Sequence, residues 1–174
     1  MKSFFGFIGS VFLLGMMVWT ISINVAIAPV HAAIRQLEEA PGQIVYQARQ
    51  TLQDKQGNSW QVIAFKRIRP DHAATIYLRL VGFPGTAELD HSQALTLTDS
   101  LGQTLTATDI SQEMFSDKTQ VELNAAEYDL QPILMQLEVG IPLRLLLPTL
   151  NQPEITLNVS PETVEEWQSL TSQK

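Results

Sequence analysis

The chain has 174 residues, a formal net charge of −7, a hydrophobic fraction of 45% and no cysteine. The missing cysteines exclude disulfides, thiolate chemistry and cysteine-ligated metal sites. All charged side chains except one lysine lie in residues 33–174, and their acidic excess disfavours nucleic-acid binding, because phosphate contacts need basic side chains.

Residues 1–32 have the composition of a secretory leader. One lysine supplies the positive start, residues 4–28 carry no charge, and Val30 and Ala32 occupy the −3 and −1 positions of a cut after Ala32. This is the layout of a signal peptide. The uncharged run also exceeds the roughly 20 residues that span a bilayer, so an uncleaved membrane anchor is the alternative. Either way, residues 33–174 are expected to form one exported domain.

Two segments of this domain share one pattern. Residues 51–60 and 96–105 both read Thr-Leu, any residue, Asp, two residues, Gly, an amide residue, a hydroxyl residue and a large apolar residue. The aspartate can accept hydrogen bonds from the backbone of a turn, and the glycine can adopt a positive φ. Each segment therefore predicts a β-hairpin whose turn is closed by Asp54 or Asp99.

Apolar runs bounded by turn residues predict strands along the whole domain. These strands are residues 43–53, 59–68, 74–83, 94–99, 103–108, 119–123, 141–147 and 154–159. Short strands separated by turns at such spacing predict a mainly β fold, either a small antiparallel β-sandwich or an open barrel.

Helices are expected to be few. Residues 160–162 (Ser-Pro-Glu) form a start signal, and the apolar side chains at 164, 167 and 170 then fall on one face, which predicts a C-terminal helix lying on the sheet. A short internal helix is predicted within residues 129–138, where the proline can occupy a first turn. Residues 34–40 are predicted to form a turn of helix.

The histidines give little support for catalysis or metal binding. Asp90, His91 and Ser92 are the residue types of a hydrolase triad, but adjacent side chains point in different directions and cannot form one together. His72 and His91 could hold a metal only with nearby acids, at a spacing that fits no metal motif. We therefore predict no catalytic, cofactor or metal site, and an exported hydrolase using either histidine is the weakest hypothesis.

Lys66, Arg67 and Arg69 form the one basic cluster of an acidic domain. Strand alternation places Lys66 on one face and both arginines on the other. The simpler interpretation is protection of an edge strand by charge. The functional interpretation is a docking patch for an acidic partner or for anionic lipid headgroups.

Residues 130–137 and 141–150 are the most apolar part of the domain. They are expected to form core. The alternative is an exposed groove for a lipid or a partner helix, because leucine and methionine suit adaptable surfaces.

The domain as a whole resembles a known family. The resemblance rests on residues 33–42 (AIRQLEEAPG), followed by TLQDKQGNSWQVIAFKRI, YLRLVGFPG, LDHSQALTLTDSLGQTLTA, YDLQPILMQL, IPLRLLLP and SPETVEEWQSL. These runs are similar to an uncharacterised family of exported cyanobacterial proteins, classed only as a domain of unknown function. The resemblance implies a cyanobacterial source and a periplasmic or thylakoid-lumenal address, and it brings no catalytic residue.

The function expected from these features is that of a non-enzymatic accessory protein. It would bind or stabilise a membrane protein complex, photosynthetic or respiratory, from the lumenal or periplasmic side. The alternative is a carrier that holds a small apolar ligand inside a barrel or between two sheets, which requires a cavity of roughly 300 Å³ or more.

Overall fold

A computed structural model describes residues 34–70, 72–114 and 122–174. The expected leader, and residues 119–121 of the strand predicted at 119–123, lie outside these ranges. The first of two antiparallel sheets has the order β1-β2-β3-β4-β7, with β1 at Arg35–Ala40, β2 at Gln43–Gln53, β3 at Ser59–Arg69, β4 at His72–Gly82 and β7 at Ala125–Asp129. The second has the order β6-β5-β8-β9, with β5 at Leu95–Asp99, β6 at Thr104–Ala107, β8 at Leu143–Leu147 and β9 at Ile155–Val159.

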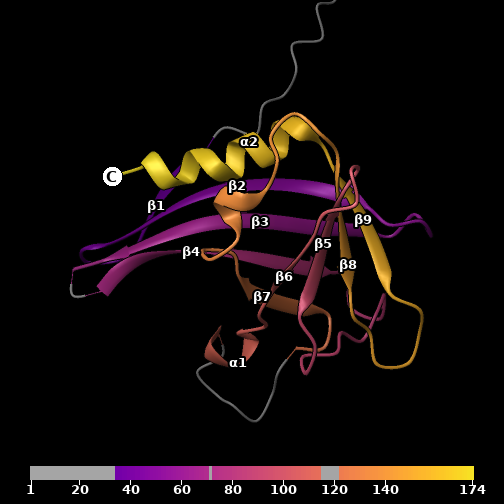
Figure 1. Cartoon of the computed structure of the whole chain (residues 1–174). Helices are drawn as coiled ribbons and strands as arrows, with labels where there is room; N and C mark the ends of the chain where they lie inside the picture. Colours follow the sequence, from indigo (N-terminus) through magenta and orange to yellow (C-terminus); the bar gives the residue numbers. More distant parts are fainter. Residues whose placement is uncertain (1–33, 71, 115–121) are drawn as a thin grey trace, which may run out of the picture.

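The predicted fold class is confirmed: the domain is mainly β, with a C-terminal helix and a short internal helix. The helices are α1 (Ser111–Met114) and α2 (Pro161–Ser169), and the 3₁₀ turns are η1 (Leu134–Gln136) and η2 (Leu170–Ser172). Because the two sheets are separate, the sandwich describes the arrangement better than the open barrel (Figure 1). No helix in the described parts of the chain is long and apolar enough to cross a membrane.

Both predicted hairpins are confirmed, together with the hydrogen bonds of their turns. Oδ1 of Asp54 accepts bonds of 2.9 Å from the backbone N–H groups two and four residues later. Oδ1 of Asp99 accepts the equivalent two bonds, at 2.8 and 2.9 Å. Gly57 and Gly102 have φ values of 85° and 91°, which a side chain would strain. The repeated pattern therefore encodes two turns of the same construction.

The start of the domain corrects one prediction. Residues 35–40 form β1 and not a turn of helix, and they pair with β2 so that Leu37 lies opposite Val45. Gly42, with a φ of 76°, closes the intervening turn. Leucine, glutamate and alanine favour helices when they are isolated, but the backbone hydrogen bonds offered by β2 override that weak preference.

Three further differences concern the middle of the chain. The strand β7 and the helix α1 were not among the predicted elements, because Ala-Ala-Glu has low β-propensity and α1 is a single turn. The helix predicted within residues 129–138 is reduced to η1. In the strand predicted at 119–123, Glu122 and Leu123 are not in a strand.

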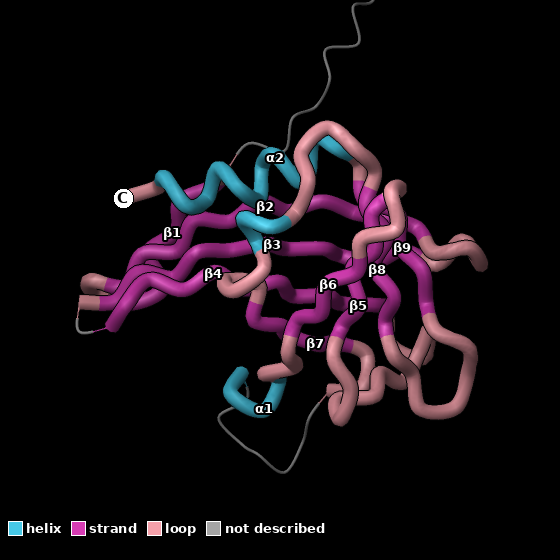
Figure 2. Tube along the Cα trace, viewed as in Figure 1, coloured by secondary structure: helices cyan, strands magenta, loops and turns pink. Residues whose placement is uncertain are grey.

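The core lies against one face of the five-stranded sheet, which we call its inner face. Val62 and Leu78 from this sheet, Leu145 and Leu157 from the second sheet, and Trp167 from α2 are all fully buried in one cluster. Figures 1 and 2 show α2 lying along one half of the sheet, while the second sheet crosses the other half at a steep angle. Seven residues of 130–137 and 141–150 contribute to this core, as expected: Leu130, Ile133, Leu134, Leu137, Leu143, Leu145 and Leu147.

The outer face of the same sheet is different. Apart from α1 beside β7, no described helix or strand lies over it in Figures 1 and 2. It carries a second, smaller apolar cluster formed by Val45, Ile63 and Phe65, with Tyr77 packed against them. This face is where the candidate site lies.

Candidate docking surface

The register of the five-stranded sheet gathers arginines on its outer face. Directly paired residues of antiparallel strands project on the same side of a sheet. Arg49 and Arg79 both lie opposite Ile63, and Arg67 lies opposite Val45. Arg35 pairs with Gln47 of β2, and Gln47 pairs with Phe65 on its other side. Four of the six arginines in the chain therefore share one face.

Two of these arginines stack on aromatic rings. The guanidinium of Arg67 lies 5.1 Å from the ring centre of Phe65 and 5.9 Å from that of Tyr77, and the guanidinium of Arg79 lies 5.1 Å from Phe65. The two rings are 5.4 Å apart. A stacked guanidinium is attracted to the ring face and still presents its N–H edge to a carboxylate. We call the six residues Arg35, Arg49, Phe65, Arg67, Tyr77 and Arg79 the arginine face.

Acidic neighbours hold the two stacked arginines with different strength. Nη2 and Nε of Arg79 donate to Oε2 of Glu127, at 2.7 and 3.0 Å, and Glu127 is almost completely buried. Nε of Arg67 lies 3.4 Å from Oε2 of Glu39 but has no hydrogen bond partner. Arg79 is therefore fixed by two charge-assisted hydrogen bonds, whereas Arg67 is held by a single, longer ion pair and its side chain is 18% exposed.

The basic cluster of the sequence is divided between the two faces, as strand alternation predicts. Nζ of Lys66 points to the inner side, where it donates to the backbone oxygens of Thr171 and Gln173, both at 2.8 Å. Arg67 and Arg69 line a hollow of about 280 Å³ beside the arginine face. Lys66 therefore anchors the C-terminal segment, and the two arginines lie on the opposite side of the strand.

Arg35, Arg49 and Arg79 are members of the arginine face that were not predicted as docking residues. The signal that could have found them is the alternation within their strands, since Arg49 and Arg79 fall on the same side as Ile63 and Arg67. That inference needed the strand order and register, which a single sequence does not provide.

A second cluster of polar side chains lies around His91. Its Nδ1 lies 3.0 Å from Oδ2 of Asp109, and the two side chains are 14% and 6% exposed. The other oxygen of Asp109 accepts a 2.8 Å bond from the Ser111 N–H. Ser92 instead donates to Asp90, at 2.6 Å. The pair resembles the base and orienting acid of a triad, but no described serine or threonine hydroxyl is hydrogen-bonded to His91.

The environment of His91 favours its protonated form. The hydrogen bond to Asp109 raises the pKa of His91 above 6.5, burial opposes this, and the charge of Asp109, the backbone of Glu122 and the charge of Asp90 add to the rise. The buried hydroxyl of Tyr128 has its pKa raised by burial and by the same two aspartates. The pair is therefore a clasp between residues 89–93 and 108–111 that favours the protonated form of His91.

We expect this clasp to make stability depend on pH. Because the pKa of His91 is raised in the folded state, its contribution is complete below about 6.5 and is lost as the pH rises through the folded-state value. The test is urea unfolding of the wild type, His91→Gln and the control His72→Gln, which alters an exposed histidine. The stability difference between wild type and His91→Gln should shrink with rising pH, and a difference that grows with pH would contradict the assignment.

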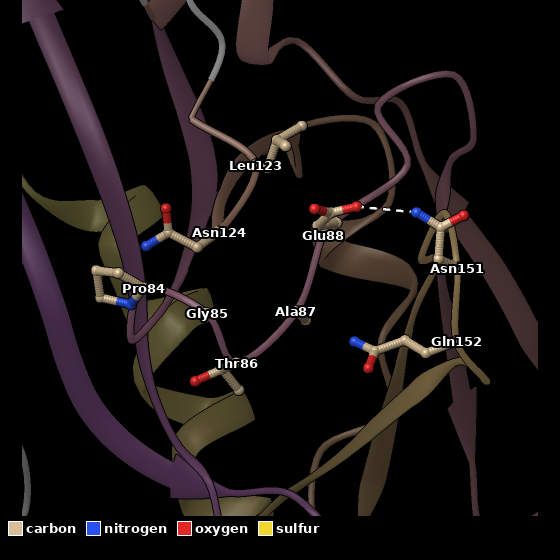
Figure 3. Close-up of a pocket in the computed structure, with 9 residues that line it drawn as sticks. All are labelled: Pro84, Gly85, Thr86, Ala87, Glu88, Leu123, Asn124, Asn151 and Gln152. Atoms are coloured by element: carbon tan, nitrogen blue, oxygen red, sulfur yellow. Dashed lines mark hydrogen bonds between the residues drawn. The ribbon is translucent and has the colours of Figure 1, made fainter.

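A pocket of about 510 Å³ lies among loops at one end of the sheets (Figure 3). Three segments line it: residues 84–88 after β4, residues 123–124 before β7, and residues 151–152 between β8 and β9. It is not the space between the sheets that an apolar-ligand carrier requires. Among the described residues, no group of three or more histidine or acidic side chains is placed to hold a metal ion.

Comparison with known proteins identifies a family but no characterised relative. No curated protein and no solved structure matches the chain. A family model described as "Protein of unknown function (DUF3122)" matches residues 32–170, which is most of the chain. The protein therefore belongs to the DUF3122 family.

Proposed function

We propose that this protein is a non-enzymatic accessory factor that binds and stabilises a membrane protein complex through its arginine face. The observation that carries the proposal is the concentration of four arginines around two aromatic rings, on a sheet face of an acidic chain that, apart from α1 beside β7, no described helix or strand covers. Arginine and aromatic residues are enriched at the centres of protein interfaces, where they contribute most of the binding energy.

The chemistry of the face selects an acidic partner. Stacking on Phe65 holds the guanidinium of Arg67 in place, so little side-chain entropy is lost when it pairs with a carboxylate. Arg35 and Arg49 are exposed and add positive charge around this centre. An exposed aspartate- or glutamate-rich surface on the partner would complement the face and would be repelled by the rest of the chain.

The address of the protein is part of the same proposal. The leader-like composition of residues 1–32 supports export, and the family resemblance supports the thylakoid lumen or the periplasm. In either compartment the arginine face would meet the exported surface of a photosynthetic or respiratory complex. A leader retained through residues 4–28 would also hold the domain close to that surface.

Purification of the tagged full-length protein from its native membranes tests this function. We expect a membrane protein complex to co-purify and its recovery to fall as salt rises, because exposed charge pairs are screened over about 8 Å at physiological ionic strength. Recovery wholly in the soluble fraction at every salt concentration would contradict the proposal. Binding to protein-free vesicles of anionic lipid that is as strong as binding to native membranes would assign the face to the membrane surface instead.

A further inference from the structure

The loop pocket of Figure 3 has a chemistry opposite to that of the arginine face. Glu88 is the one charged residue among the described residues that line it, and Asn124, Asn151 and Gln152 contribute side-chain amides. Nothing in the proposed function uses this pocket. We infer that it binds the guanidinium group of an arginine side chain carried by a partner polypeptide.

The walls of the pocket are fixed by hydrogen bonds. The backbone N–H of Gly82 donates to the backbone oxygen of Asn124, and Nδ2 of Asn124 donates back to the Gly82 oxygen, both at 2.8 Å. The N–H of Leu150 donates to the backbone oxygen of Glu88 at 2.9 Å. The three segments therefore hold their relative positions before a ligand arrives, which reduces the entropy lost on binding.

The same bonds leave a carboxylate oxygen and an amide oxygen of the pocket without a partner among the described residues. Nδ2 of Asn151 donates a hydrogen bond to Oε2 of Glu88, at 2.9 Å, and Nδ2 of Asn124 donates one to the backbone oxygen of Gly82. Each of these two amides uses one of its two N–H donors in this way, and Oδ1 of Asn124 and Oε1 of Glu88 have no hydrogen bond partner among the described residues. Figure 3 shows that Oε1 lies on the side of Leu123 and Asn124. Glu88 is the only charged residue of the described lining and one of its oxygens is unused, so its charge favours a cationic donor over a neutral one.

The shape of the lining favours guanidinium over ammonium. Carboxylate and amide groups are planar acceptors, and guanidinium presents five donors in a plane, whereas ammonium is a compact point charge. Pro84, Ala87 and Leu123 supply apolar surface beside these acceptors, which suits the three methylene groups of an arginine stem.

A partner polypeptide is favoured over free arginine by the surroundings of the pocket. Phe83 and Leu150 immediately precede lining segments and are 66% and 52% exposed, and Leu123 in the lining is 44% exposed. Exposed apolar side chains around a polar anchor point are typical of peptide and protein contact sites. A free amino acid would leave them uncovered.

Binding of capped tripeptides to the isotope-labelled full-length protein tests the inference. Gly-Arg-Gly is compared with Gly-citrulline-Gly, which keeps the shape without the charge, and with Gly-Lys-Gly, while the side-chain amide signals of Asn124, Asn151 and Gln152 are followed by NMR. We expect the arginine peptide to shift these signals and the citrulline and lysine peptides to bind about tenfold more weakly, the size of one charge-assisted hydrogen bond.

Glu88→Gln is the matched variant, because glutamine keeps an acceptor for Asn151 and removes the charge. It should weaken the arginine peptide about tenfold, whereas Glu138→Gln, which changes an exposed acid outside the pocket, should not. Absence of binding, equal binding of the citrulline peptide, or full binding by Glu88→Gln would overturn the site. Equal binding of the lysine peptide would overturn the choice of guanidinium, and equal binding of free arginine amide would overturn the polypeptide source.

Discussion

Replacement of Arg79 with methionine is expected to lower the free energy of unfolding by about 3 kcal/mol, the lower end of the range for buried ion pairs, because the Arg79 side chain is 31% exposed. Methionine keeps an apolar stem over Phe65 but removes both hydrogen bonds to Glu127. Glu127 is 4% exposed, so its carboxylate would remain buried without a compensating charge. Removing one member of a buried ion pair is costly for this reason, even when the pair itself contributes little net stability. Denaturant unfolding of the two proteins measures the difference.

The double variant Arg79→Met/Glu127→Gln separates this explanation from a loss of packing. Glutamine is neutral, so no charge is left buried without a partner, and the double variant should be clearly more stable than Arg79→Met alone. Arg144→Met, on the exposed side of β8, is the control and should change stability by less than about 0.5 kcal/mol. A double variant less stable than Arg79→Met would show that the buried charge is not the cause.

The second large effect is expected at Trp60, the fully buried residue that begins the inner face of β3. Trp60→Ala should destabilise the protein by about 3–5 kcal/mol, because it opens a large cavity in the core. It also removes the 3.2 Å hydrogen bond from Nε1 of Trp60 to Oδ2 of Asp54, which connects the core to the first hairpin turn. Thermal or denaturant unfolding is the measurement.

Gly82 provides a specific check on the packing of Trp60. A Cβ atom at Gly82 would lie 3.0 Å from two ring atoms of Trp60, which is too close for a ring that is fully enclosed. Gly82→Ala should therefore cost about 1–3 kcal/mol in the wild type. In the Trp60→Ala background the ring is gone, and the same substitution should cost much less. Equal costs in both backgrounds would show that Trp60 does not determine the size limit at this position.

Local patterns in the sequence were sufficient to predict the two hairpins and the last helix. Asp54 and Asp99 form their turns with neighbouring residues, so the pattern contains the whole physical cause. The α2 start is equally local, with Ser160 as its cap and a proline in the first turn. The main strands followed from alternation because their buried faces are continuous.

The remaining elements depend on long-range pairing that one sequence does not reveal. β1 has six exposed residues with helix-favouring side chains, and only its partner β2 makes it a strand. Glu127 in β7 looks unsuited to a buried strand until Arg79 is placed beside it. The arginine face itself brings together residues that are up to 44 positions apart, so the sequence alone shows Arg67 but not the surface to which it belongs.

The two polar surfaces have complementary proposed roles. The arginine face would pair with acidic groups of a membrane protein complex, and the loop pocket would accept an arginine from a partner polypeptide. They lie on different elements, since the face is built on β1–β4 and the pocket on three loops. Variants of one surface should therefore leave the other unaffected, which allows each to be tested separately.

The most direct test of the docking claim is recovery of the complex with charge-reversed proteins from native membranes. Arg35→Glu/Arg49→Glu alters two exposed members of the arginine face, and Lys55→Glu/Arg144→Glu makes the same change in net charge elsewhere on the surface. We predict that the first pair reduces recovery of the complex at least about tenfold, because like charges facing each other across an interface cost several kcal/mol, while the second matches the wild type. Equal recovery with the two double variants, whether high or low, would contradict docking through the arginine face.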